Sequence, residues 1–482
     1  MTTVDKTGYD KTAWEMVVGL EVHVELRTET KLFCGCRNAF GDEPNTNICP
    51  VCLGLPGSLP VLNRMAVEYA MRIGLALHCE VKPSIFHRKN YFYPDMPKDY
   101  QTSQYDEPIN VDGWLELPDG TRIGIERAHM EEDTGKTTHL GTTGRIHGAD
   151  SSLVDYNRAG VPLVEIVSRP DLRSSEHARA YVSELRAIVV ATGASDGKME
   201  EGSLRVDANV SLRPVGVEEF GTRCEIKNLN SLRSLGRAIE YEASRQAQLL
   251  GDGGRVIQET RHWVEGEGRT VSGRSKEEAY DYRYFPEPDL VPVDPGENWK
   301  ALVASLLPVL PAERRRRLAE AAGVTPAEVA VIVDLDLDAL VTAAIDGGAD
   351  GRIAVNRVTN EVAADAEAGR TLDPTSFTRL VAMEGSGKVT ASQSKTILKE
   401  LLAAGGGDPE AIAAAKGFEA LGDDALGAAV DAAIAAHPAE WERFKGGDPK
   451  VAGLFVGQVM KATQGQADGK AVTALLRQRA GQ

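Results

Sequence analysis

The chain has 482 residues, of which 42% are hydrophobic and 26% are charged, and its formal net charge is −17. This length predicts two or three domains. The negative charge argues against nucleic-acid binding over the entire surface, because phosphate binding depends on clustered Lys and Arg. No apolar run approaches the ~20 residues that span a bilayer, and the N-terminus lacks the apolar core of a signal peptide. We therefore expect a cytoplasmic protein with neither a membrane nor DNA as a partner.

Residues 17–26 (VVGLEVHVEL) are predicted to form a β-strand with two unlike faces. Successive side chains of a strand point to opposite faces. One face is therefore apolar, and the other carries Glu21, His23 and Glu25. This polar row indicates a cation site inside a cleft, although a solvated edge strand with chance charges is an alternative.

Four of the six cysteines form two close pairs, Cys34-x-Cys36 and Cys49-x-x-Cys52. Two thiolate pairs joined by a loop of this length can close a tetrahedral shell around zinc. The pattern predicts a structural Zn²⁺ site that staples the loop over residues 34–57. A redox pair or small buried side chains are the alternatives, and disulfides are not expected in a cytosolic chain.

Residues 64–77 have the apolar spacing of a helix that packs on a sheet. Residues 88–101 (RKNYFYPDMPKDYQ) are predicted to be irregular, because two prolines interrupt them. Lys and Asp are interleaved there with aromatic side chains, which suits stacking on a base and charge contacts to phosphates. An aromatic-anchored surface loop explains the same residues equally well.

Four further stretches combine apolar backs with ionisable fronts, and together they predict a curved antiparallel sheet whose concave face is a site. Their polar residues are Glu131, Glu132 and Asp133 in 123–133; Glu165 in 155–168; Arg205, Asp207, Asn209 and Ser211 in 204–212; and Glu225 and Lys227 in 223–228. Glu165 is the only carboxylate of its apolar run, where an ionised group is costly unless it is paired or bound to a metal.

The remainder of the chain is predicted to be helical. A stretch rich in proline and aromatic residues, 280–293, ends the first domain. We expect domains at 1–296, 297–372 and 373–482, the last built of alanine-rich helices and glycine-rich turns. The four arginines at 314–317 favour a solvated helix face over a nucleic-acid contact. The stretch between His139 and Val154, which contains His147, is predicted to be an extended hairpin loop without a chemical role.

Several long motifs in this order resemble the GatB family, the B subunits of aspartyl/glutamyl-tRNA amidotransferases. They are GLEVHVEL, CPVCLGLPGSLPVLN, RKNYFYPDMPKDYQ, HMEEDTGK, DYNRAGVPLVEIVS, EGSLRVDANVS and EIKNLNSL. The resemblance covers nearly the entire chain. It implies an α+β protein: a cradle domain with a glutamine-synthetase-like antiparallel sheet, an all-α linker and an all-α, tRNA-binding tail.

The resemblance also implies a reaction. Members of the family use ATP to phosphorylate the side-chain carboxylate of Glu on tRNA(Gln) or of Asp on tRNA(Asn). Ammonia, released from glutamine by a partner amidase subunit (GatA), then displaces the phosphate, and a small subunit (GatC) clamps the other two. This is an ATP-dependent carbon–nitrogen ligase that is active within a heterotrimer.

The resemblance assigns roles to the polar residues. The Mg²⁺ ligands would be Glu21, His23, Glu132 and Glu165. The choice of Glu132 over Glu131 rests on the family, since alternation turns the two residues to opposite faces. Other catalytic or nucleotide-binding candidates are Arg205 and Lys227 for phosphoryl oxygens; Lys89, Tyr91, Lys98 and Asn209 for the nucleotide or the tRNA 3′ end; and Asp207 and Glu225 as bases for ammonium. A structural ion pair is the alternative for most of them.

Two other functions compete with this one. A self-sufficient ligase acting on a small carboxylate would need its own ammonia source and would have no use for the helical tail. A noncatalytic, zinc-stapled RNA-binding scaffold is disfavoured by the acidic balance and by the inward row of carboxylates. Removing the tail should lower tRNA binding by a GatB-like subunit and should change nothing in a small-carboxylate ligase. Glu21→Gln should abolish the activity of an enzyme, whereas a scaffold would bind RNA as before.

Overall fold

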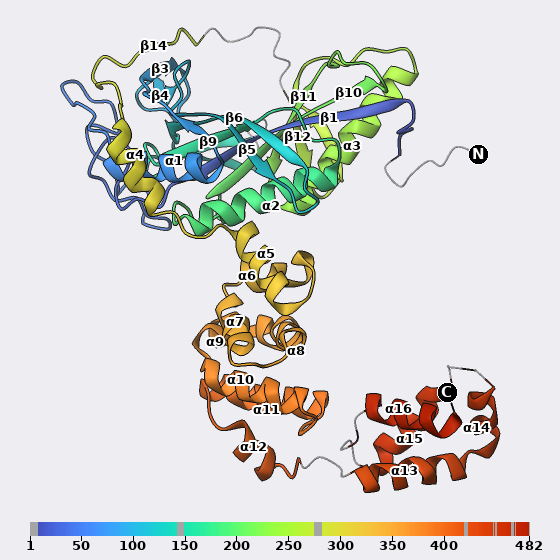
Figure 1. Ribbon diagram of the computed structural model, residues 1–482. Coiled ribbons are helices and arrows are strands. Elements are labelled where there is room, and N and C mark those ends of the chain that lie inside the picture. The colour runs from blue at the N-terminus through green and yellow to red at the C-terminus, as the bar shows by residue number, and fades with distance from the viewer. Residues whose placement is uncertain are drawn as a thin grey trace. The chain divides into compact units, whose positions relative to one another are not determined.

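The computed structural model divides into two compact units, Met1–Leu310 and Pro311–Gln482. The first unit combines a large sheet with helices and the second is helical (Figure 1), which confirms the α+β class. In the part of the chain that is described, no helix is long and apolar enough to cross a membrane. The described residues are 8–141, 149–273, 282–418, 423–446, 448, 451–463, 467 and 469–481.

Twelve strands of the described residues form one sheet. Its main path runs β13 (Arg269–Ser272), β12 (Thr260–Val264), β11 (Cys224–Leu229), β10 (Leu204–Pro214), β1 (Trp14–Glu25), β9 (Pro162–Ser168), β6 (Arg122–Glu132), β4 (Tyr100–Gln104), β3 (Phe86–Asn90) and β14 (Phe285–Pro286). Off this path, β5 (Asn110–Glu116) pairs with β6 and with β2 (Glu80–Val81). The strand pairs are antiparallel except β11 and β12, which are parallel, so the sheet is mixed rather than purely antiparallel.

Three helices cover the apolar face of this sheet (Figure 1): α1 (Arg64–Ala76), α2 (Ser175–Ala191) and α3 (Leu232–Gly251). Each begins where a side-chain oxygen of Asn63, Ser174 or Ser231 accepts a backbone N–H of the first turn. The apolar side chains of β1 are almost fully buried beneath these helices. The alternation predicted for this strand is confirmed, and its other face is left for Glu21, His23 and Glu25.

Two paired strands fall within the predicted hairpin region. Strand β7 (Lys136–Gly141) pairs with β8 (Ala149–Asp155) in antiparallel register, with an irregularity at Gly141. This pairing agrees with the predicted hairpin, while residues 142–148, and His147 with them, lie outside the described residues. The two strands form a separate two-stranded sheet.

The first unit extends beyond the expected boundary near Gly296. Helix α4 (Gly296–Ser305) packs against α1. Val303 belongs to the core of the first unit, and the Arg64 guanidinium lies 4.9 Å above the Trp299 ring. The core therefore holds α4, and the compact unit ends at Leu310.

The second unit contains two clusters of buried apolar residues among its described residues. One runs from Leu318 to Ala413 and the other from Leu426 to Leu476. The expected boundary at 372/373 falls inside the first cluster, because α10 packs against α7 there. The helical segments are α5 (Pro311–Ala322), η1 (Pro326–Val329), α6 (Ala330–Asp334), α7 (Asp338–Asp346), α8 (Gly351–Arg357), η2 (Val358–Val362), η3 (Ala363–Asp365), α9 (Ala366–Thr371), α10 (Pro374–Gly385), α11 (Ala391–Ala404), α12 (Pro409–Ala415), α13 (Asp423–Ala436), α14 (Pro438–Lys445), α15 (Ala452–Ala462) and α16 (Gly469–Ala480).

The four-arginine run lies on α5 and is only partly solvated. Arg316 and Arg317 are exposed and pair with Glu313 on the same helix. Arg315 is buried, and Arg314 is bound to Asp338 at 2.6 Å. The run therefore stabilises the helical unit as well as facing water.

Candidate functional site

The polar face of the sheet forms a cleft with two overlapping cavities of about 500 and 860 Å³. Ligand sites commonly have volumes of ~300–1,000 Å³. The floor comes from β1, β6, β9, β10 and β11, so segments distant in the sequence meet there. The residues that line both cavities are His23, Lys89, Gln101, Glu131, Asp207, Lys227 and Tyr282.

The first acidic group consists of His23, Glu131 and Glu165. One ligand atom of each lies within 4.8 Å of those of the other two. His23 Nε2 is 3.5 Å from Glu131 Oε1 and 3.7 Å from Glu165 Oε2. Strand register explains this convergence, because His23 of β1 is directly opposite Glu165 of β9.

The protonation of this group reflects burial and like charge. Burial, reinforced by the Glu165 carboxylate, raises the pKa of Glu131 to about 8. Burial lowers the pKa of His23. Glu165 behaves differently: burial pushes its pKa up, but His129, His23, Arg127 and Lys89 together act in the other direction, so its pKa is lowered. A bound cation would supply the positive charge that Glu131 lacks.

The second acidic group consists of Glu21, Asp207 and Glu225, again with ligand atoms within 4.8 Å of one another. Lys227 Nζ lies between two of them, 2.5 Å from Asp207 and 2.8 Å from Glu225. Burial, then the charges of Glu165 and Glu225, raise the pKa of Glu21. Although burial acts in the other direction, Asp207 and Glu225 raise the pKa of Lys227, which keeps it a cation.

Two neutral side chains fix the second acidic group. Asn209 Nδ2 donates a hydrogen bond of 3.0 Å to Glu21 Oε1. Thr260 Oγ1 donates one of 2.7 Å to Glu225 Oε2. Asn209 was expected to bind the nucleotide, and here it positions Glu21.

The donor chemistry of the first acidic group fits a divalent cation, since it offers two carboxylates and one imidazole. The second group offers three carboxylates, but Lys227 already supplies it with one positive charge. The expected ligand set of Glu21, His23, Glu132 and Glu165 is thus divided. His23 and Glu165 are in the first group and Glu21 is in the second.

Glu132 does not reach the cleft. It points to the opposite face of β6, where its carboxylate pairs with Lys98 and accepts the backbone N–H of Thr102 at 2.8 Å. Its place in the cleft is taken by Glu131, as strict alternation requires. Lys98, expected to bind the nucleotide, is instead buried with Glu132 and lines neither cavity.

The other expected nucleotide-binding residues are in the cleft. Lys89 lines both cavities, with its Nζ 4.8 Å above the Tyr282 ring. Tyr91 lines the larger cavity and stacks on Tyr93. Arg205 also lines the larger cavity, where it pairs with Asp133 at 2.9 Å.

The family resemblance assigns no role to four polar residues of this region: Glu25, His129, Asp133 and Thr260. Alternation along β6 would have grouped His129 and Asp133 with Glu131, and the pattern of β1 already places Glu25 on the polar face. Burial, with the nearby Asp133 charge, raises the pKa of Glu25 to about 7. Thr260 carries no such signal, because it enters through the parallel pairing of β11 and β12.

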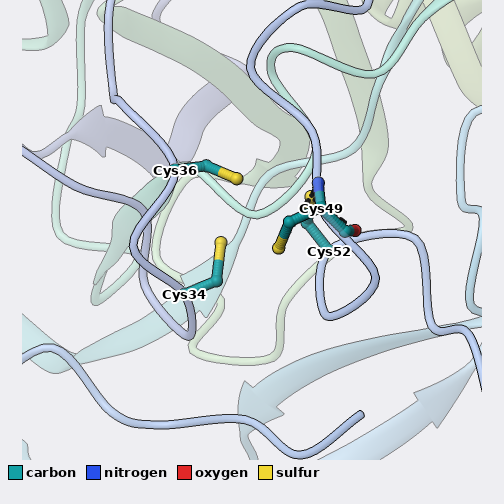
Figure 2. Close-up of side chains that lie close together, drawn as sticks. All are labelled: Cys34, Cys36, Cys49 and Cys52. Carbon is teal, nitrogen blue, oxygen red and sulfur yellow. Dashed lines mark hydrogen bonds between the residues drawn. The ribbon is translucent and has the colours of Figure 1, made fainter.

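The four clustered cysteines also converge. Figure 2 shows the thiols of Cys34, Cys36, Cys49 and Cys52 turned toward a common centre, and their sulfurs lie within 4.8 Å of one another. A hydrogen bond from the Cys34 thiol lowers the pKa of Cys52 to about 5, which favours the thiolate that binds metal. Four thiols in this arrangement fit a structural zinc ion.

The cysteine loop is held against the turn between β8 and β9. Leu32 N donates to Gly160 O at 2.9 Å, and the Lys31 amine donates to Tyr156 O at 3.2 Å as well as to Asn47 O of the loop itself at 2.7 Å. Gly160 has φ +84°, and a Cβ there would lie 3.7 Å from Cys52 Cβ and 3.9 Å from Glu132 Oε2. The loop therefore lies close to Glu132.

A mixed sheet with a charged cleft, helices on its other face and a helical C-terminal unit define an α+β protein of two parts. Residues 16–301 match the family described as "GatB/GatE catalytic domain", and residues 339–479 match the "GatB domain". The chain belongs to the GatB family.

Relatives match it almost end to end. One from Frankia casuarinae is 54% identical and covers 97% of this chain and 96% of its own length. One from Salinispora arenicola is 52% identical, covering 99% of each chain. One from Mycobacterium tuberculosis is 52% identical, covering 97% of this chain and 95% of its own. Each is named as the B subunit of an aspartyl/glutamyl-tRNA(Asn/Gln) amidotransferase.

Proposed function

We propose that this chain activates and amidates a carboxylate carried by tRNA. It uses ATP to phosphorylate the side chain of Glu on tRNA(Gln), of Asp on tRNA(Asn), or of both. Ammonia then attacks the acyl phosphate, the C–N bond forms, and inorganic phosphate leaves. The observation that carries the proposal is the cleft itself: two acidic groups beside Lys89, Lys227 and Arg205, within the part of the chain that matches a catalytic domain.

The first step brings two anions together. A carboxylate is repelled by the phosphates of ATP unless positive charge lies between them. His23, Glu131 and Glu165 would hold Mg²⁺, which when bound neutralises phosphate charge. Lys89 and Arg205, which both line the larger cavity, would bind phosphoryl oxygens, Arg205 through its planar fork.

The second step needs neutral ammonia. Ammonium must lose a proton before it can attack. Asp207 and Glu225 already contact the Lys227 ammonium group, so they can accept N–H donors of this kind. We assign them the role of binding ammonium and accepting its proton, with Asn209 and Thr260 holding Glu21 and Glu225 in place.

The relatives' names describe a subunit, which supports a complex. In this proposal an amidase subunit (GatA) releases ammonia from glutamine and a small subunit (GatC) joins the two. The helical second unit binds the tRNA, and zinc in the four-cysteine site stabilises the first unit.

The test is reconstitution of the complex with its amidase and small subunits. Glu-tRNA(Gln) or Asp-tRNA(Asn) should be converted to the amide only when ATP and glutamine are both present. Free glutamate and free aspartate serve as controls. Amidation of the free amino acids instead would identify a small-carboxylate ligase, and no amidation of either kind would overturn the proposal.

A further inference from the structure

His129 lies beside the first acidic group without belonging to it. The register of β6 and β9 places His129 opposite Glu165, and the register of β1 and β9 places His23 opposite Glu165 from the other side. Glu165 Oε2 is 3.4 Å from His129 Nε2 and 3.7 Å from His23 Nε2. One carboxylate oxygen of β9 thus lies between two imidazoles, which come from the strands on either side, β1 and β6.

The two histidines differ in access to the cleft. His23 lines both cavities, and its side chain is 21% exposed. The His129 side chain is 6% exposed and lines neither cavity. His129 therefore reaches a cleft ligand only through Glu165.

The burial of His129 is costly. Its Nδ1 is buried and has no hydrogen-bond partner among the described residues. An unsatisfied buried polar atom destabilises a fold, and an apolar side chain would avoid this cost. The unpartnered Nδ1 does not by itself assign a role; the contact of Nε2 with Glu165 does.

We propose that His129 is a positioning residue for the cation site: its Nε2–H donates to Glu165 Oε2 and holds that carboxylate turned toward His23 and Glu131. The inference rests on the proposed function, because it needs a cation in the first acidic group. Residues that orient metal ligands in this way typically change metal affinity by ~10–100-fold when they are removed.

The test is a titration of the full-length chain with Mn²⁺, in which electron paramagnetic resonance measures the free Mn²⁺. We expect His129→Leu and His129→Asn to weaken binding ~10–100-fold, because leucine has no N–H and the shorter asparagine side chain does not place its amide nitrogen at the position of Nε2. His129→Gln should restore near wild-type affinity, since its amide nitrogen can occupy the place of Nε2. Thermal unfolding of each variant separates lost binding from lost structure.

His87 supplies the matched control. It is 5% exposed, its Nε2 is 3.2 Å from Asp106, its Nδ1 is also buried without a hydrogen-bond partner among the described residues, and it lines neither cavity. His87→Leu should leave Mn²⁺ affinity unchanged. Wild-type affinity in folded His129→Asn would overturn the role of His129 alone, and so would failure of His129→Gln to restore binding. Absence of Mn²⁺ binding to the wild-type chain would overturn the proposed cation site itself.

Discussion

Glu131 and Glu132 are neighbours in β6, and both are buried, yet they lie in opposite kinds of surroundings. Glu132 is compensated by Lys98 and by the backbone N–H of Thr102. Glu131 faces Glu165, and burial with that like charge raises its pKa to about 8. Glu132 is thus paired with a lysine, whereas Glu131 has the His23 imidazole at 3.5 Å and the like charge of Glu165 beside it. Burial alone therefore does not mark a functional carboxylate; the charges packed against it do.

The largest effect on stability should come from the four-cysteine site. If zinc occupies the four-cysteine site as proposed, removing it with a chelator, or replacing Cys49 by Ser, should destabilise the first unit by more than about 4 kcal/mol, because the metal would hold the loop beside Glu132. Urea unfolding measures this loss. Cys79→Ser lies outside the four-cysteine cluster and is the control. Equal unfolding with and without chelator would show that the cysteines hold no stabilising metal.

Lys98→Met should destabilise the protein by ~3–5 kcal/mol, because it leaves the Glu132 carboxylate buried without its cation. The double variant Lys98→Met with Glu132→Gln removes both charges and should recover part of this loss. Urea unfolding of the single and double variants measures the coupling. If the two single variants lose nothing, the compensated character of Glu132 is wrong.

Glu131→Gln should have the opposite effect to breaking the Lys98–Glu132 pair: it should lower activity and leave stability intact. We expect kcat for tRNA-dependent amidation to fall ~10²–10³-fold, while the stability of the cation-free chain near neutral pH stays about equal, because Glu131 with a pKa of about 8 is already mostly uncharged there. Glu132→Gln is the matched variant and should retain the chemistry in the fraction that folds. The two measurements are initial rates in the reconstituted complex and urea unfolding. Loss of activity in Glu132→Gln with full activity in Glu131→Gln would invert the comparison.

The sequence predicted the α+β class, the helix beginning at Arg64, the two-faced strand β1 and the convergence of four cysteines. It also contained the information that separates Glu131 from Glu132, because Met130 and Glu132 alternate with His129 and Glu131. The family resemblance favoured Glu132, whereas the structure pairs Glu132 with Lys98 and leaves Glu131 in the cleft.

Other features depend on long-range contacts that no local pattern carries. Thr260 reaches Glu225 through a parallel strand pair, and Asn209 is turned to Glu21 by the register of β1 and β10. The compact unit extends past residue 296 to Leu310 for the same reason, since the packing of α4 on α1 joins distant segments.

The smallest effect, taken per pH unit, is on the pH dependence of stability. Glu131 has a pKa of about 8 in the folded chain against an ordinary value of 4.5, so the folded state binds more protons between these values. Stability of the cation-free protein should therefore fall as pH rises from 4.5 to 8, by at most about 1.4 kcal/mol per pH unit from this group. Urea unfolding at pH ~5.5 and pH ~8 measures the slope. Glu131→Gln should flatten it, and an unchanged slope in that variant would assign the effect to other groups.

The central claim is that a divalent cation binds on the Glu131 face of the sheet. The most direct test is to titrate the full-length Glu131→Gln and Glu132→Gln variants with Mn²⁺ and to measure the free Mn²⁺ by electron paramagnetic resonance. The claim predicts that Glu131→Gln loses binding by ~10-fold or more while folded Glu132→Gln binds as the wild type does. Retained binding in Glu131→Gln, with loss in Glu132→Gln, would contradict it.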